Sequence, residues 1–200
     1  MLTKGLLNVG RLTVTGGFFL LLAALLCLDE RGLIGTLFLL CAVHEAFHLV
    51  TILLLGGHVK QLYLTGVGAE LLLDGASLSY PMEVAAALAG PAGSVMAARF
   101  LADAGALPAA GLSLALGLFN LLPARPLDGG RALYFVLAWA LSPAAADRVV
   151  AASSWLCALL LCLLGVPAAR FSGNFTPLLI GLWLLLLAKR DVCVYNSRRI

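Results

Sequence analysis

Two histidines and a glutamate stand inside a long apolar stretch of the sequence, Leu33–Gly57. Residues 44–48 of this stretch read His-Glu-Ala-Phe-His. On an α-helix, residues four positions apart lie one turn above each other on the same face. His44 and His48 can therefore bind one metal ion, and Glu45 projects beside them, where it can take a proton from a water molecule at that metal. Zinc hydrolases use this H-E-x-x-H arrangement.

A hydrolytic zinc site needs a third protein ligand and an open position for water. The remaining candidates in the chain are His58, Glu70, Asp74, Glu83, Asp103 and Asp128. Asp128 follows two prolines three residues apart, which exclude regular helix, and precedes two glycines, which permit close backbone approach. Irregular backbone at membrane depth is tolerated only inside protein or beside a water-filled cavity. These features favour Asp128, while Glu70 and His58 stay open as alternatives. We expect Asp103 to pair with Arg99 and the other acidic candidates to be solvated in an interfacial loop.

The composition is that of an integral membrane protein. Hydrophobic residues make up 62% of the chain and charged residues 12%, whereas a soluble domain has roughly half and a quarter. Several runs approach the roughly 20 apolar residues that cross a bilayer. We therefore predict an all-α integral membrane protein with about six transmembrane helices. Five cysteines without a C-x-x-C pair indicate neither a disulfide framework nor a cysteine zinc site.

Turns and charged residues separate the predicted spans. The spans cover approximately residues 13–28, 33–55, 81–103, 109–122, 149–166 and 175–188. After the second span, residues 58–73 alternate between polar and apolar and contain Gly66 and Gly68. This pattern predicts a short membrane-associated β-rich stretch of one or two strands, with an ordinary cytoplasmic loop as the alternative.

The composition along the chain predicts the number of domains, and the positions of the Lys and Arg residues predict the membrane topology. No long linker, internal repeat or soluble domain is visible, so we predict one membrane-embedded domain over residues 1–200, with its core at about residues 33–140. Most Lys and Arg residues fall in segments that a six-span topology with an inside N-terminus puts on one side. The positive-inside rule then predicts a multi-pass protein of the cell membrane with both termini in the cytoplasm. The basic tail around Arg198 and Arg199 suits anionic lipid and not nucleic acid.

Small residues recur every four positions along the third predicted span. One face carries Ala86, Gly90 and Ser94, and the next carries Ala89, Gly93 and Ala97. Such ladders allow helices to approach closely in membranes. We interpret them as packing against another span, and a substrate-facing surface is the less favoured reading.

Two motifs together resemble a known family. An H-E-x-x-H motif in an early span, followed by N-x-x-P-x-x-P-L-D-G-G at residues 120–130, is similar to the site-2 protease family of intramembrane zinc metalloproteases. Residues 89–91, Ala-Gly-Pro, resemble a further family element. The resemblance covers about residues 33–140 and is greatest to the compact branch that contains a sporulation protease processing a pro-sigma factor. It implies that zinc is bound by His44, His48 and Asp128, that Glu45 is the catalytic acid/base, and that Asn120 positions the substrate.

The resemblance also implies a reaction. The expected activity is hydrolysis of a peptide bond in or near a transmembrane segment of a membrane-protein substrate, as in regulated intramembrane proteolysis. A regulatory membrane partner is a further expectation. The chain departs from the family pattern at Ser94, where the third-span motif often ends in Asn. It is also expected to lack the C-terminal nucleotide-binding CBS domain of sporulation relatives, so regulation through such a domain does not carry over.

Three other readings use the same residues. The first is a divalent-metal transporter or metal-binding membrane protein, although transporters often show repeated halves and none is visible here. The second is a membrane protease that trims prenylated C-termini, against which the L-D-G-G segment argues. The third is a scaffold with a relic metal site. Within the protease reading, the 58–73 stretch offers an edge strand for an unwound substrate, and proline at Leu62 or Leu64 is predicted to abolish cleavage.

Overall fold

The computed structural model of the chain describes residues 5–9, 12–15, 32–57, 59–65, 68–73 and 78–197. In the strands and after residue 189 only the backbone is considered. The strands are β1 (Gly5–Val9), β2 (Leu12–Thr15), β3 (Val59–Thr65) and β4 (Gly68–Leu73). The helices are α2 (Leu33–Leu54), α3 (Tyr80–Asp103), α4 (Leu107–Asn120), α5 (Asp128–Ala140), α6 (Pro143–Ser172) and α7 (Thr176–Ser197).

Local sequence signals explain where several helices begin and end. α2 ends two residues before Gly56, whose φ of 81° is a conformation that glycine adopts readily. α3 begins with a proline in its first turn and carries Glu83 there, as a helix N-terminus favours. The hydroxyl of Ser142 accepts a hydrogen bond from the Ala145 amide and caps α6, which ends at Gly173 with φ 67°.

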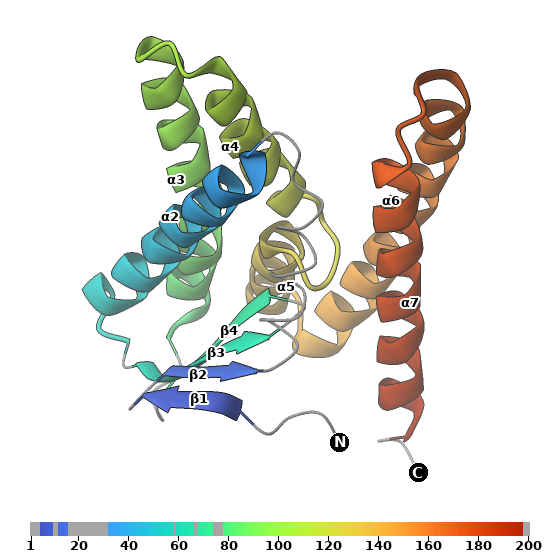
Figure 1. Cartoon of the computed structure of the whole chain (residues 1–200). Helices are drawn as coiled ribbons and strands as arrows, with labels where there is room; N and C mark the ends of the chain where they lie inside the picture. The colour runs from blue at the N-terminus through green and yellow to red at the C-terminus, as the bar shows by residue number, and fades with distance from the viewer. Residues whose placement is uncertain are drawn as a thin grey trace.

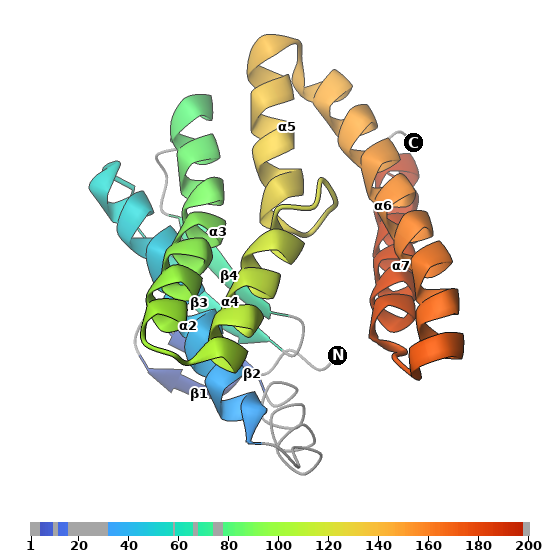
Figure 2. The same ribbon diagram turned by 90° about the horizontal axis from the view of Figure 1, so that it is seen from above.

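α3 packs against α2, α4 and α5, and α2 crosses in front of it in the view of Figure 1. α5 in turn packs against α6, and α6 pairs with α7 over most of its length. Figure 2 shows the α6–α7 pair set beside the other helices, with α5 between them. The chain therefore forms a group around α3 and an attached helical hairpin.

The four strands form one sheet at one end of the helices (Figure 1). Their order is β1-β2-β3-β4. β1–β2 and β3–β4 pair antiparallel, whereas β2 and β3 are parallel, with Leu12 opposite Leu62 and Val14 opposite Leu64. β3 is therefore an inner strand with partners on both sides, and β1 and β4 are the edges of the described sheet.

The predicted fold class needs correction. Among the described residues, three helices and not about six are long and apolar enough to cross a membrane, namely α2, α3 and α6; Leu107–Asn120 and Thr176–Lys189 are shorter apolar helices. α4 is only 14 residues long because Pro123 and Pro126 follow it closely. The predicted first span began at Thr13, but Thr13 lies in β2, and the rest of that span lies outside the described residues. The sheet also includes β1 and β2, where no strand was predicted.

Large apolar side chains face outward and small ones fill the contacts between helices. Leu54 and Phe171 are among many exposed apolar residues, at 82% and 85% exposure, whereas the buried hydrophobic residues are mostly alanines. In water this arrangement would be unfavourable, but helices in lipid associate through small residues and present apolar side chains to the hydrocarbon. The helices are those of a membrane protein.

Candidate metal centre

His44, His48 and Asp128 converge in the interior, as the sequence motifs predicted. The Nε2 atoms of the two histidines lie 3.2 Å apart, and Asp128 Oδ2 lies 3.0 Å from Nε2 of His44 and 3.1 Å from Nε2 of His48. Both histidines are buried, at 3% and 6% exposure. In the described part of the chain this is the one group of three or more potential metal ligands whose donor atoms meet.

The other ring nitrogen of each histidine has a partner on α3. His48 Nδ1 lies 2.7 Å from the backbone oxygen of Ala86, and His44 Nδ1 lies 2.8 Å from the hydroxyl of Ser94. A carbonyl oxygen only accepts hydrogen bonds, so His48 must carry a proton on Nδ1. In the neutral ring, Nε2 of His48 then presents a lone pair to the shared centre.

A divalent metal fits this arrangement. The lone pair of His48 Nε2 faces the carboxylate of Asp128, and two acceptors at such a distance repel unless a cation or proton lies between them. Three ligand atoms bound tetrahedrally to zinc at roughly 2.0–2.1 Å lie about 3.3 Å from one another, close to the separations found here. Two imidazoles and one carboxylate are also a donor set that catalytic zinc uses, with a further position left for water.

The small-residue ladder of α3 is the surface on which the histidines rest. The Ala86 oxygen and the Ser94 hydroxyl contact the two Nδ1 atoms, and Gly90 lies between these residues: a Cβ at Gly90 would lie 2.6 Å from Nε2 of His44 and closer still to His48. On the neighbouring face, a Cβ at Gly93 would overlap the ring of Phe47. The predicted packing against another span is confirmed, and the partner is α2.

The segment between α4 and α5 brings Asp128 to the histidines. A Cβ at either of the next two residues, Gly129 or Gly130, would overlap the backbone of residues 121–125, so these glycines let the segment fold back on the start of α5. α6 holds the same segment from outside. Ser153 donates to the Pro123 oxygen over 2.6 Å, and Ser154 accepts from the Arg125 amide over 2.9 Å.

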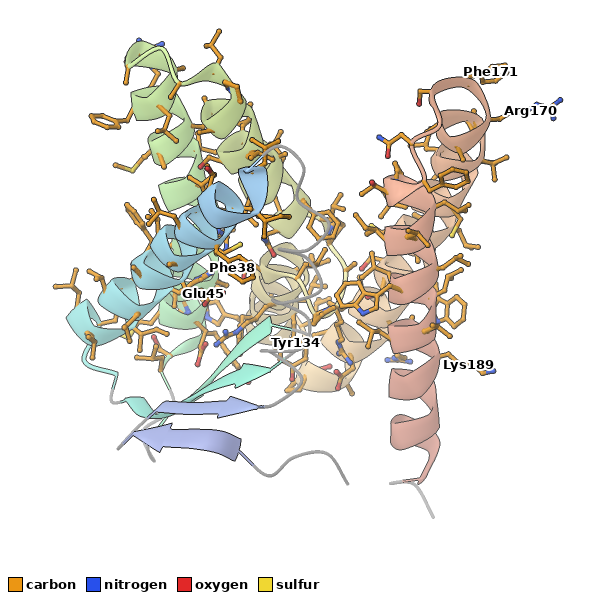
Figure 3. All side chains as sticks on the ribbon, in the orientation of Figure 1. Phe38, Glu45, Tyr134, Arg170, Phe171 and Lys189 are labelled. Atoms are coloured by element: carbon orange, nitrogen blue, oxygen red, sulfur yellow. The ribbon has the colours of Figure 1, made fainter. Side chains whose placement is uncertain are left out.

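Glu45 follows His44 on α2 and is half-buried; Figure 3 labels it on that helix. Its carboxylate lies within electrostatic range of His44, His48 and Asp128, and also of Arg131. A carboxylate beside a metal centre in this way is suited to move a proton between water and a leaving group.

Asn120 is not part of the converging group. It is the last residue of α4, and its amide donates to the Leu116 oxygen one turn back over 3.1 Å. Its expected role toward substrate therefore stays a prediction.

Two of the other acidic candidates have partners elsewhere. Asp103 pairs with Arg99 over 3.0 Å on the exposed end of α3, which confirms that expected pair. Glu83 was expected to be solvated, and this was wrong: it is 8% exposed and accepts from Arg131 over 3.2 Å. His58 and Asp74 lie outside the described residues, and so does the side chain of Glu70.

A cavity of about 440 Å³ lies along α5 next to the centre. Its lining includes Arg125, Arg131, Tyr134 and Asp147. Arg125 pairs with Asp147 and stacks 5.9 Å from the ring centre of Tyr134, and Arg131 pairs with Glu83. The charged side chains in the cavity wall are therefore neutralised by ion pairs.

Sequence reasoning missed the groups that support the ligands. Ser94 was noted only as a departure from a family motif, and the Ala86 oxygen and the α6 serines were not considered. The i, i+4 spacing of Ala86, Gly90 and Ser94 was the available signal, since it matches the spacing of the two histidines.

A buried His–His–Asp group beside apolar helices that can cross a membrane is a candidate metal centre of a membrane protein. Comparison with known proteins finds similar sequences and a similar structure. A model of peptidase family M50 matches residues 72–164. The chain is 34% identical over 175 residues to a candidate zinc metalloprotease of Synechocystis sp., an alignment that covers 78% of this chain and 45% of that relative. The chain thus spans about half the length of this curated relative.

The structure of the site-2 protease from Methanocaldococcus jannaschii has the same fold. It superposes with a TM-score of 0.70 at 22% sequence identity and covers 94% of each chain. The comparisons agree with the resemblance seen in the motifs: residues 72–164 match the model of peptidase family M50, and the chain has the fold of the site-2 protease.

Proposed function

We propose that the protein is an intramembrane zinc metalloprotease that hydrolyses a peptide bond in or near a transmembrane segment of a membrane-protein substrate. The observation that carries this proposal is the meeting of two histidine Nε2 atoms and one carboxylate oxygen within 3.0–3.2 Å, with Glu45 beside them. α2, which carries the two histidines, and α3, which supports them, are long and apolar enough to cross a membrane. We propose that the catalytic core lies within residues 33–140.

His44, His48 and Asp128 would hold the zinc ion. When bound, zinc polarises the scissile carbonyl and makes water a nucleophile at neutral pH. Glu45 accepts a proton from the attacking water at its carboxylate and then donates it to the leaving amine nitrogen. Ser94 and the Ala86 oxygen keep both imidazoles turned toward the ion, as outer partners do in other metal sites.

The substrate must be extended before it is cut, because an α-helix hides its peptide bonds in i→i−4 hydrogen bonds. We propose that β4 receives the unwound segment, since it is an edge of the described sheet and pairs there only with β3. This moves the docking strand away from Leu62 and Leu64, which lie in the inner strand β3. Proline at those two positions would break the sheet itself.

We propose that both termini face the cytoplasm. Charges within the described helices support this orientation. Arg148 lies near the start of α6 and Arg170 near its end, and Lys189 lies toward the other end of the hairpin from Arg170 (Figure 3). The topology predicted from the sequence assigns most of the chain's basic residues to the same side of the membrane as Arg148 and Lys189. The positive-inside rule puts the side with more basic residues in the cytoplasm.

Glu45→Gln tests the proposed chemistry. The purified protein should keep one zinc ion per chain, while cleavage of a membrane-protein substrate in detergent or vesicles should fall roughly 10²–10⁴-fold, because a positioned acid/base contributes about that much. Asp103→Asn is the matched control, since it makes the same chemical change at the exposed end of α3 and should leave cleavage intact. Cleavage by Glu45→Gln at the wild-type rate would exclude the assigned role.

The transport alternative predicts a different result. A transporter would carry zinc across proteoliposome membranes, and its zinc flux would not require Glu45 as a proton carrier. Zinc flux without peptide cleavage in the wild type would replace the protease proposal.

A further inference from the structure

The two histidines of the centre are supported in different ways. His48 Nδ1 donates to a backbone oxygen, that of Ala86. His44 Nδ1 lies 2.8 Å from a side chain, the hydroxyl of Ser94. The orientation of His44 therefore depends on a residue that substitution can remove, whereas that of His48 depends on the backbone of α3.

The surroundings of Ser94 are closely packed. Ser94 is 1% exposed, and Gly117 on α4 lies against it, since a Cβ there would lie 3.0 Å from the Ser94 Cβ. The hydroxyl of Ser113 on α4 donates to the Ser94 backbone oxygen over 2.8 Å. Ser113 therefore contacts the backbone of α3 and not the Ser94 hydroxyl, which faces His44.

Removal of the acceptor would leave His44 with an unpaired N–H in an apolar interior. A buried donor without a partner is unfavourable, and the ring can avoid that cost by rotating or by moving its proton to Nε2. Either change takes the Nε2 lone pair away from the shared centre.

We propose that Ser94 is the positioning residue for His44. It accepts from Nδ1, which keeps the proton on that atom and leaves the Nε2 lone pair for the metal. This inference rests on the proposed function only in that His44 binds the zinc ion. It also gives a role to the residue at which the chain departs from the family motif.

Zinc affinity of the full chain measured by chelator competition tests the inference. Ser94→Ala should weaken zinc binding roughly 10–100-fold, the usual effect of losing such an outer partner. Ser113→Ala is the matched control, because it removes an equally buried hydroxyl that does not touch the histidine, and its affinity should stay near that of the wild type. Wild-type affinity in Ser94→Ala, or an equal loss in both variants, would overturn the role of Ser94.

A second measurement uses the wild type alone and does not depend on how the variants fold. The chain has only three histidines, so a ¹⁵N-histidine spectrum of the zinc-loaded protein is simple to assign. The inference predicts a proton on Nδ1 of His44; a proton on Nε2 would contradict it. Failure of the wild type to bind zinc would instead count against the proposed function.

Discussion

Gly90 lies where α3 crosses the two histidines, and its lack of a side chain is what lets them converge. An added Cβ would lie 2.6 Å from Nε2 of His44 and closer to His48. The imidazoles could make room, but only by swinging out of the centre and away from Asp128. The absence of a side chain at Gly90 therefore matters more for metal binding than for helix packing.

Gly90→Ala should accordingly lose zinc before it loses its fold. Overpacking typically costs about 1–3 kcal/mol, which corresponds to a loss of affinity of roughly 5–150-fold. Gly111→Ala is the control: Gly111 lies in α4 with nothing within 4 Å of the added Cβ, and alanine favours helix there. Zinc titration and thermal unfolding of the metal-free variants separate the two effects. Equal zinc affinities for both variants would contradict the prediction.

The proposed metal ligands were readable from the sequence, and the residues that support them were not. The i, i+4 spacing of His44 and His48 and the broken segment around Asp128 carry chemical signals of their own. A serine hydroxyl or an alanine carbonyl carries none until the register of α3 against α2 is known. Glu83 was misjudged for the same reason, because its partner Arg131 lies 48 residues further along the chain.

At the scale of the elements, α6 fixes the segment that delivers Asp128. Ser153 donates to the Pro123 oxygen, Ser154 accepts from the Arg125 amide, and Asp147 pairs with the Arg125 guanidinium. Proline-containing backbone of this kind has few hydrogen bonds of its own. The position of α6 therefore sets the position of a metal ligand.

Ser153→Ala should loosen this segment. The loss of one such hydrogen bond is worth about 0.5–1.5 kcal/mol, so we expect zinc to bind roughly 2–12-fold more weakly and cleavage to slow. Ser172→Ala serves for comparison, because that exposed hydroxyl donates only to the Ala168 oxygen of its own helix. Zinc affinity and kcat/KM are measured for the two variants. Equal values would show that the contact with α6 does not stabilise the segment that carries Asp128.

Proline in β4 tests whether this edge receives the substrate. Along a strand in an antiparallel pair, successive N–H groups point alternately toward the partner strand and away from it. Of the substitutions Leu71→Pro and Leu72→Pro, one removes an N–H that faces β3 and the other removes an N–H on the open edge. The second should reduce cleavage while zinc content and thermal stability stay near wild type. Full cleavage in the variant that keeps its stability would show that the substrate binds elsewhere.

At the scale of the whole molecule, the sheet and the helices depend on pairings between distant parts of the chain. The positions of the helices around α3 in the sequence could be predicted, because each is an apolar run bounded by glycine or proline. The parallel pairing of β2 with β3 was not, because it joins residues 12–14 to residues 62–64 and nothing local specifies it. The six predicted spans failed where proline shortened α4 and where Thr13 entered a strand.

Removal of the metal should destabilise the whole chain, because the proposed ligands join α2 to α5. A ligand present at 100–1,000 times its Kd stabilises by about 2.7–4.1 kcal/mol, which corresponds to roughly 5–16 °C in Tm for a chain of this size. A strong zinc chelator should lower the Tm of the wild type by such an amount and leave that of His44→Ala unchanged. The same shift in both proteins would mean that the chelator acts elsewhere.

The distance along the chain between the proposed ligands, 80 and 84 residues, bears on how the protein is made. At about 5–20 residues per second, Asp128 leaves the ribosome roughly 4–17 s after His44. During that interval the two histidines lack Asp128. α3 is already synthesised, so its Ala86 oxygen and Ser94 hydroxyl can form hydrogen bonds with the Nδ1 atoms. All three proposed ligands are then present only after the start of α5 has been synthesised, and a bound ion marks a chain in which α2 and α5 have come together.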